Sequence, residues 1–178
     1  MRREVMDLDM TNIREFTLAR LPDRYKAEIF KAGVCAGLAK LSFENDKVLF
    51  DTSGHTNIRN YLVKDRRAGI NESVCKLLTV LRKVSESVLA ASDWLVYDSD
   101  VALDPELLWL CRKDGKIKLL PGTGEGSFTE RLCALAKAFP ECGGETVAER
   151  IAAKHSESNL NIRALLAFLS DWELELRG

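Results

Sequence analysis

The stretch "VALDPELLWL", residues 101–110, organises this chain, because it places a turn directly before an apolar run. Asp104 and Pro105 are typical of a turn, since proline fixes its own backbone angle and aspartate bonds nearby backbone amides. Leu107, Leu108 and Leu110 are expected to enter the core. The next residues contain Asp-Gly at 114–115 between two apolar runs, which predicts a hairpin of 107–112 with 116–120.

Upstream of this stretch, the longest predicted element is a helix over 71–91. Its apolar residues recur at helical spacing, and Asn71 is expected to cap its start. Before it, the pattern predicts a strand at 13–20, a helix at about 22–32 with Gly33 as its stop, a hairpin of 37–43 with 47–52, and a short helix at 56–63.

Downstream, a glycine-containing loop at 121–126 precedes a predicted helix at about 128–139. Ser127 and Glu130 form a capping box at its start, and Thr146 and Glu149 form a second such pattern further on. A last helix is predicted at about 161–173. Strands and hairpins fill the first third and helices most of the rest, so the fold class is α+β.

Composition excludes several kinds of partner. The chain has 178 residues and a net charge of −1, so nothing indicates a nucleic-acid-binding protein. The densest basic cluster, Lys64, Arg66 and Arg67, is interpreted as a solvated helix end. No apolar run approaches the roughly 20 residues that cross a bilayer, so direct membrane insertion is not expected. Five scattered cysteines without metal-ligand spacing predict free thiols in the cytoplasm and no zinc site.

The glycine-containing loop is the first candidate for chemistry, because glycines between a strand and a helix can hold phosphates. Gly122 and Gly124 alternate with other residues, and Glu125 places a negative charge where an anion would sit. The lysine that ends a phosphate-binding loop is missing. A flexible surface loop is therefore expected, with an atypical nucleotide-binding enzyme that uses residues 121–127 as the alternative.

A second candidate is the acidic group Asp98, Asp100, Asp104 and Glu106. Carboxylates can hold a divalent cation, but the calcium-loop pattern fails here, so a solvated acidic loop is expected. The two histidines, His55 and His155, are not paired with a serine or cysteine nucleophile by any pattern in the sequence. No cofactor and no metal are therefore predicted.

The order of elements, together with "LDPELLWL", resembles the protein kinases, whose catalytic loop reads similarly to "LKPENILL". In that comparison, residues 51–56 correspond to the hinge, followed by the long helix, the catalytic loop and a hairpin ending in the metal-binding triplet. More closely, "LFDTSGHTNIRNYL" and "VALDPELLWLCRKDGKIKLLPG" resemble an uncharacterised domain at the N-terminus of bacterial forkhead-associated proteins. That family is itself similar to the pseudokinase-like cytoplasmic domain of a type VII secretion subunit.

The resemblance implies a single domain over 1–178. It would have a reduced N-lobe of about three strands and one helix at about 12–52, and a helical C-lobe with one hairpin at about 56–174. Phosphoryl transfer needs a catalytic Asp, metal-binding Asn and Asp, and a phosphate-contacting Lys. The corresponding positions here are Ala102, Leu107 and Leu120, and Lys40 and Lys47 lie in the hairpin instead of before the helix.

These positions predict a non-catalytic protein-interaction or signalling module with an unidentified protein partner. The structural subunit of a secretion apparatus is a further alternative. The loops expected to contact a partner share exposure and polarity, and their residues are Asp51, Ser53, Gly54, His55, Asp98, Asp100, Gly122, Gly124 and Glu125.

Overall fold

The computed structural model describes residues 12–18, 20–63 and 69–178, and within them the chain is a mixed α+β protein. The basic cluster at 64–67 lies outside the described residues. The α-helices of the protein are α1 (Arg24–Ala32), α2 (Ile58–Val63), α3 (Ile70–Ser92), α4 (Phe128–Lys137), α5 (Gly144–Ser158) and α6 (Ile162–Arg177). Its strands are β1 (Ile13–Thr17), β2 (Leu41–Glu44), β3 (Lys47–Asp51), β4 (His55–Asn57), β5 (Trp109–Cys111) and β6 (Ile117–Lys118).

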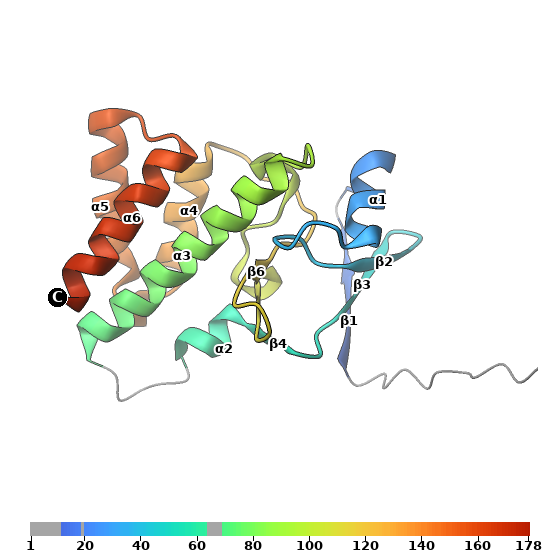
Figure 1. The fold of residues 1–178 in the computed structure, drawn as a ribbon, viewed down its shortest axis with the longest axis horizontal. Helices are drawn as coiled ribbons and strands as arrows, with labels where there is room; N and C mark the ends of the chain where they lie inside the picture. Colours follow the sequence, from blue (N-terminus) through green and yellow to red (C-terminus); the bar gives the residue numbers. More distant parts are fainter. Residues whose placement is uncertain (1–11, 19, 64–68) are drawn as a thin grey trace, which may run out of the picture.

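Two small antiparallel sheets divide the molecule. The first has the order β1-β3-β2, and the second has the order β4-β5-β6. Figure 1 shows the first sheet and α1 at one end of the molecule, α3 to α6 gathered at the other, and the second sheet between them. The buried apolar residues of both ends form one continuous cluster, with the long helix α3 contributing Leu77, Leu81 and Val84.

The predicted elements are largely confirmed, including both hairpins, the stop of α1 at Gly33 and the capping box at the start of α4. Three local predictions are wrong. Helix α3 begins at Ile70 with Gly69 as its cap, not at Asn71. Thr146 lies inside α5, which already begins at Gly144. Residues 56 and 57, predicted as the start of a helix, belong instead to strand β4, which pairs with β5.

A close backbone contact joins the end that contains the first sheet to the second sheet. The segment before β2 runs parallel to the end of β6, with hydrogen bonds from Ala39 N to Leu119 O (2.9 Å) and from Leu119 N to Gly37 O (3.0 Å). Gly37 also lies against α3, where a Cβ would come 2.7 Å from the carbonyl oxygen of Ser87. Any larger residue at position 37 must therefore push the first sheet away from α3.

At the opposite edge of α3, Glu173 of α6 is buried and joins the two helices. Its carboxylate accepts hydrogen bonds from Thr79 Oγ1 (2.7 Å) and Arg82 Nε (3.0 Å), and it pairs with Arg177. Burial raises the pKa of Glu173, but these partners outweigh it and hold the pKa below its ordinary value. The carboxylate therefore stays charged and paired between the helices at neutral pH.

All five cysteines are free thiols in the structure. None of the helices in the described ranges has the length and apolar character needed to cross a membrane.

The contact at Gly37 yields a test of the fold. Gly37→Ser should lower the free energy of unfolding by about 1–3 kcal/mol, because the added side chain meets backbone atoms that cannot move easily. The matched control is Gly69→Ser, where a Cβ meets nothing within 4 Å and serine is a favourable helix cap. Urea unfolding of the two variants measures the difference, and equal losses would contradict the assigned packing.

Candidate functional site

A cleft of about 540 Å³ lies where the first sheet meets the rest of the molecule. The end of β1 forms one wall, through Thr17, Leu18 and Arg20. The opposite walls come from residues 102–107, from the loop at 121–125 and from α4. The cleft is therefore built from four segments that lie far apart in the sequence.

The floor of the cleft is formed by two extended segments that pair with each other. Ala102 N donates to Leu120 O and Gly122 N donates to Asp100 O, both at 3.0 Å, and Val101 bridges Pro121 in antiparallel fashion. A Cβ at Gly122 would lie 2.7 Å from the Cβ of Ala102, so only glycine permits this approach. The predicted flexible surface loop is thus wrong at its first residues, because Pro121 is buried and Gly122 is packed.

Arg131 of α4 holds residues 98–101 in place, at the start of the first of these two segments. Its side chain is 10% exposed, and its guanidinium donates to Asp98 O and Val101 O, each at 2.5 Å. The Asp98 carboxylate lies 3.8 Å away. Burial lowers the pKa of Arg131 and the Asp98 charge acts in the opposite direction, with burial the larger effect. Arginine suits this position because its planar fork can satisfy two carbonyls at once.

Gly124 is part of the same arrangement. A Cβ at this position would lie 2.0 Å from Arg131 Cζ, so the glycine leaves room for the guanidinium. The alternating glycines that resemble a phosphate loop therefore have packing roles at 122 and 124. A bulky residue at 124 would displace Arg131, so it would not test ligand binding alone.

The acidic group is solvated only in part: Asp104 and Glu106 are exposed, as predicted, whereas the prediction is wrong for Asp98 and Asp100. Asp100 Oδ1 accepts a hydrogen bond from Lys26 Nζ of α1 at 2.7 Å, with both side chains 21% exposed. Its other oxygen accepts from Tyr97 N at 2.9 Å. The hydrogen bond to Asp100 raises the pKa of Lys26. Asp98 and Asp100 are therefore half-buried internal partners and a poor contact surface.

The turn at 104–107 is supported by a buried residue that sequence reasoning missed. Asn57, 7% exposed, donates through Nδ2 to Pro105 O (3.0 Å), Glu106 O (3.1 Å) and Leu108 O (3.3 Å). Asp104 accepts from Glu106 N, as expected of a turn residue. A polar residue at the start of a short helix gives no sequence signal for this role, since its partners are about 50 residues away.

The three positions that the sequence comparison sets against catalytic kinase residues lie close together in the structure. Ala102 and Leu107 line the cleft, and Leu120 is fully buried with its carbonyl bonded to Ala102 N. Each side chain is apolar, so none can bind a metal ion or a phosphate. Within the described ranges, no three His, Cys, Asp or Glu side chains are grouped so that they could hold a metal.

The hinge-like turn remains exposed at Asp51, Ser53 and Gly54. Asp51 Oδ1 accepts from Ser53 N at 2.8 Å, and the hydrogen bonds from Ser53 lower the pKa of Asp51. Gly54 has a φ of 72°, which favours glycine. His55 is half-buried, with its ring edge against Phe50 at 5.0 Å between centroids. This turn therefore links the two sheets, and its outer residues face solvent.

The amino end of α4, where a phosphate would bind, already holds a carboxylate. Glu130 Oε2 accepts from Ser127 N at 2.7 Å, and the backbone hydrogen bond from Ser127 lowers the pKa of Glu130. The Glu130 Oε2 atom also lies 2.9 Å from the place of a Cβ at Gly126. An incoming phosphate would have to displace this internal anion.

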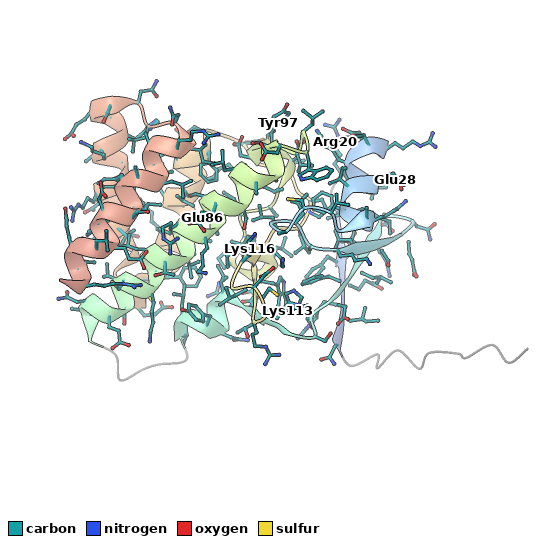
Figure 2. All side chains as sticks on the ribbon, viewed as in Figure 1. Arg20, Glu28, Glu86, Tyr97, Lys113 and Lys116 are labelled. Atoms are coloured by element: carbon teal, nitrogen blue, oxygen red, sulfur yellow. The ribbon has the colours of Figure 1, made fainter. Side chains whose placement is uncertain are left out.

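An exposed apolar loop follows α3 and was not singled out by sequence analysis. Trp94, Leu95 and Tyr97 are 38%, 54% and 49% exposed. Leu95 has a φ of 57°, an uncommon conformation for a bulky residue. Figure 2 shows Tyr97 and Arg20 in the region between the end of α3 and α1. We call residues 94–97 the aromatic loop.

The role of Arg131 can be tested by substitution. Arg131→Met should lower the free energy of unfolding by about 2–3 kcal/mol, because two carbonyls lose their donors. Amide exchange at Ala102 and Gly122 should accelerate beyond the global change. Arg112→Met, at an exposed arginine of the β5–β6 hairpin, is the matched control and should change little. Unchanged exchange at Ala102 would contradict the role assigned to Arg131.

No protein-family model matches this chain, and searches of curated proteins and of solved structures found no similar protein.

Proposed function

We propose that this protein is a non-catalytic, pseudokinase-like module that binds another protein in a bacterial cytoplasm. The observation that carries the proposal is the cleft, in which the kinase-like positions are occupied by Ala102 and Leu107, with Leu120 beneath them. A kinase active site needs carboxylates and an amide at these places to hold magnesium and to receive a proton.

A lysine of the first sheet and a lysine of α1 also support this proposal. In protein kinases a strand lysine contacts the phosphates and pairs with a glutamate of the neighbouring helix. Here Lys47 pairs with Glu15 across the sheet at 2.6 Å, and Lys26 on α1 pairs with Asp100. Both cations are thus engaged with carboxylates of the chain, Lys47 in an exposed pair and Lys26 in a half-buried one.

The aromatic loop supplies the surface that a protein partner would use. Trp and Tyr are the residues that most often contribute strongly to protein–protein binding. Leu21, 45% exposed, lines a small hollow with Asp100, so further apolar surface lies close to this loop. The left-handed backbone conformation of Leu95 costs conformational free energy. Residues held in such conformations are often found at binding sites, which favours a binding role for this exposed side chain.

The alternative of a nucleotide-binding enzyme that uses residues 121–127 is less well supported. Gly122 and Gly124 accommodate Ala102 and Arg131, and Glu130 occupies the end of α4. No described contact favours the structural subunit of a secretion apparatus over a signalling module.

Magnesium-ATP provides a direct test of the non-catalytic proposal. A bound nucleotide at about 100 times its Kd would stabilise the protein by about 2.7 kcal/mol, which a melting curve readily detects. We expect no saturable rise in Tm. A saturable rise would contradict the proposal. If the rise in Tm were then absent in Thr123→Trp, the result would favour the nucleotide-binding enzyme that uses residues 121–127, since Thr123 is exposed and lines the cleft.

The binding surface can be tested with a photo-crosslinking amino acid in cells that express the native gene. Position 95 should give a discrete, higher-mass protein adduct, because Leu95 is exposed at the centre of the aromatic loop. Position 113 is the matched control, since Lys113 is exposed at the tip of the β5–β6 hairpin (Figure 2). No adduct from position 95, or the same adducts from both positions, would count against this surface.

A further inference from the structure

The first sheet has an open edge along β1. The hydrogen bond from Leu18 N to Asp46 O (3.2 Å) continues the ladder between β1 and β3 and fixes which residues face the partner strand. Because bonded and non-bonded pairs alternate in an antiparallel ladder, the backbone groups of Ile13, Glu15 and Thr17 point away from β3. None of these groups has a hydrogen-bond partner among the described residues.

Other strand edges make contacts that β1 lacks. At β6, an edge of the second sheet, Ile117 O accepts a hydrogen bond from Ser87 Oγ at 2.7 Å. At β2, the opposite edge of the first sheet, Lys31 of α1 lies over the ring of Phe43 at 5.8 Å. An unpaired edge such as β1, five residues long, is a template for the backbone of another extended segment.

The two faces of β1 differ in polarity. Phe16 and Leu18 lie on the inner face and pack against the core. Glu15 and Thr17 lie on the outer face and are exposed. Because side chains alternate along a strand, a peptide added beside β1 would place every second side chain next to Phe16 and Leu18. Those positions of the peptide favour apolar residues.

The carboxyl end of this edge lies at the cleft. Thr17 and Leu18 line the cleft, and Ala102, Leu107 and Leu135 supply apolar surface on its other walls. A peptide side chain beside Leu18 therefore meets a concave, partly apolar site. In peptide recognition by strand addition, backbone hydrogen bonds supply affinity and pockets for alternate side chains supply specificity. The edge and the cleft together provide both.

The charges of β1 indicate which occupant fits. Glu15 pairs with Lys47 at 2.6 Å, whereas the exposed Arg14 has no ion-pair partner among the described residues. A peptide carboxylate beside Arg14 would supply one. A second copy of the chain fits less well, because full antiparallel pairing of two β1 strands places Glu15 opposite Glu15. Like charges directly opposite each other destabilise a strand pair.

We propose that β1 binds a short extended peptide of a partner protein as an added antiparallel strand, with apolar residues at alternate positions and a carboxylate near Arg14. Antiparallel pairing is the more stable arrangement per residue. The inference rests on the protein-binding role proposed above and adds a contact separate from the aromatic loop. A synthetic peptide tests it without the native partner, so a negative result here is distinguishable from a negative result at position 95.

The probe is the peptide acetyl-Val-Thr-Val-Thr-Asp-amide, whose antiparallel register sets the valines beside Leu18 and Phe16 and the aspartate beside Arg14. In an NMR titration of the full chain, the amide proton signals of Glu15 and Thr17 should shift saturably, with a Kd of about 1 mM for so short a peptide. The control peptide acetyl-Val-Pro-Val-Pro-Asp-amide lacks the two N–H groups that face β1 and should bind about tenfold more weakly. Absence of saturable shifts, or equal binding of the two peptides, would overturn the proposal.

Matched variants separate the backbone contact from side-chain effects. Glu15→Pro removes an outward N–H but no bond to β3, and an edge strand tolerates proline where the N–H faces solvent. It should weaken probe binding about tenfold, whereas Glu15→Thr, which also loses the Lys47 pair, should bind like the wild type. Thr17→Pro makes the same test if the NMR spectrum shows that Glu15→Pro is unfolded.

Two outcomes with these variants would contradict the assignment. The first is probe binding of wild-type affinity in a folded proline variant. The second is a dimer of the wild-type chain in analytical ultracentrifugation that Glu15→Pro converts to a monomer, because the edge would then belong to a second copy.

Discussion

The hydrogen bonds from Arg131 to the carbonyls of Asp98 and Val101 are the interaction on which the rest of the site depends. They fix the short 3-10 turn Asp98–Asp100 and the following Val101 against α4, so that Ala102 can pair with Leu120 and Gly122 with Asp100. Buried carbonyls need donors, and a single guanidinium supplies two in a planar arrangement. The cleft floor, the packing of Gly124 and the position of Asp98 all follow from this contact.

The first sheet is held to the remainder through backbone contact and a charged pair. The parallel bridge of Leu38 with Leu119 and the approach of Gly37 to Ser87 set its distance from α3, and Lys26 with Asp100 closes the far side. Asp100 belongs to the same segment that Arg131 holds. Through this segment, α1 and α4, on opposite sides of the cleft, are connected by direct contacts. The aromatic loop directly precedes this segment, and Ala102, directly after it, lines the cleft.

Local patterns predicted most elements correctly. Apolar spacing identified α3, Asp-Gly identified the β5–β6 hairpin, and Ser127 with Glu130 identified the start of α4. The errors at Asn71 and Thr146 share a cause. A helix cap is predicted from residue type alone, but several residues near the end of a helix can act as the cap. The predicted acidic loop is correct for Asp104 and Glu106, which are exposed, and wrong for Asp98 and Asp100, because the partners of these two lie far along the chain, in α4 and α1.

The α+β class, the two hairpins and the apolar character of positions 102, 107 and 120 could be predicted from the sequence, because short-range spacing and turn chemistry carry that information. The tertiary structure was needed to show that Ala102 and Leu107 line one cleft and that Gly122 and Gly124 make room for Ala102 and Arg131. Such contacts join residues that are tens of positions apart, and no local pattern encodes which distant side chain will complete a buried hydrogen bond or leave one unmade.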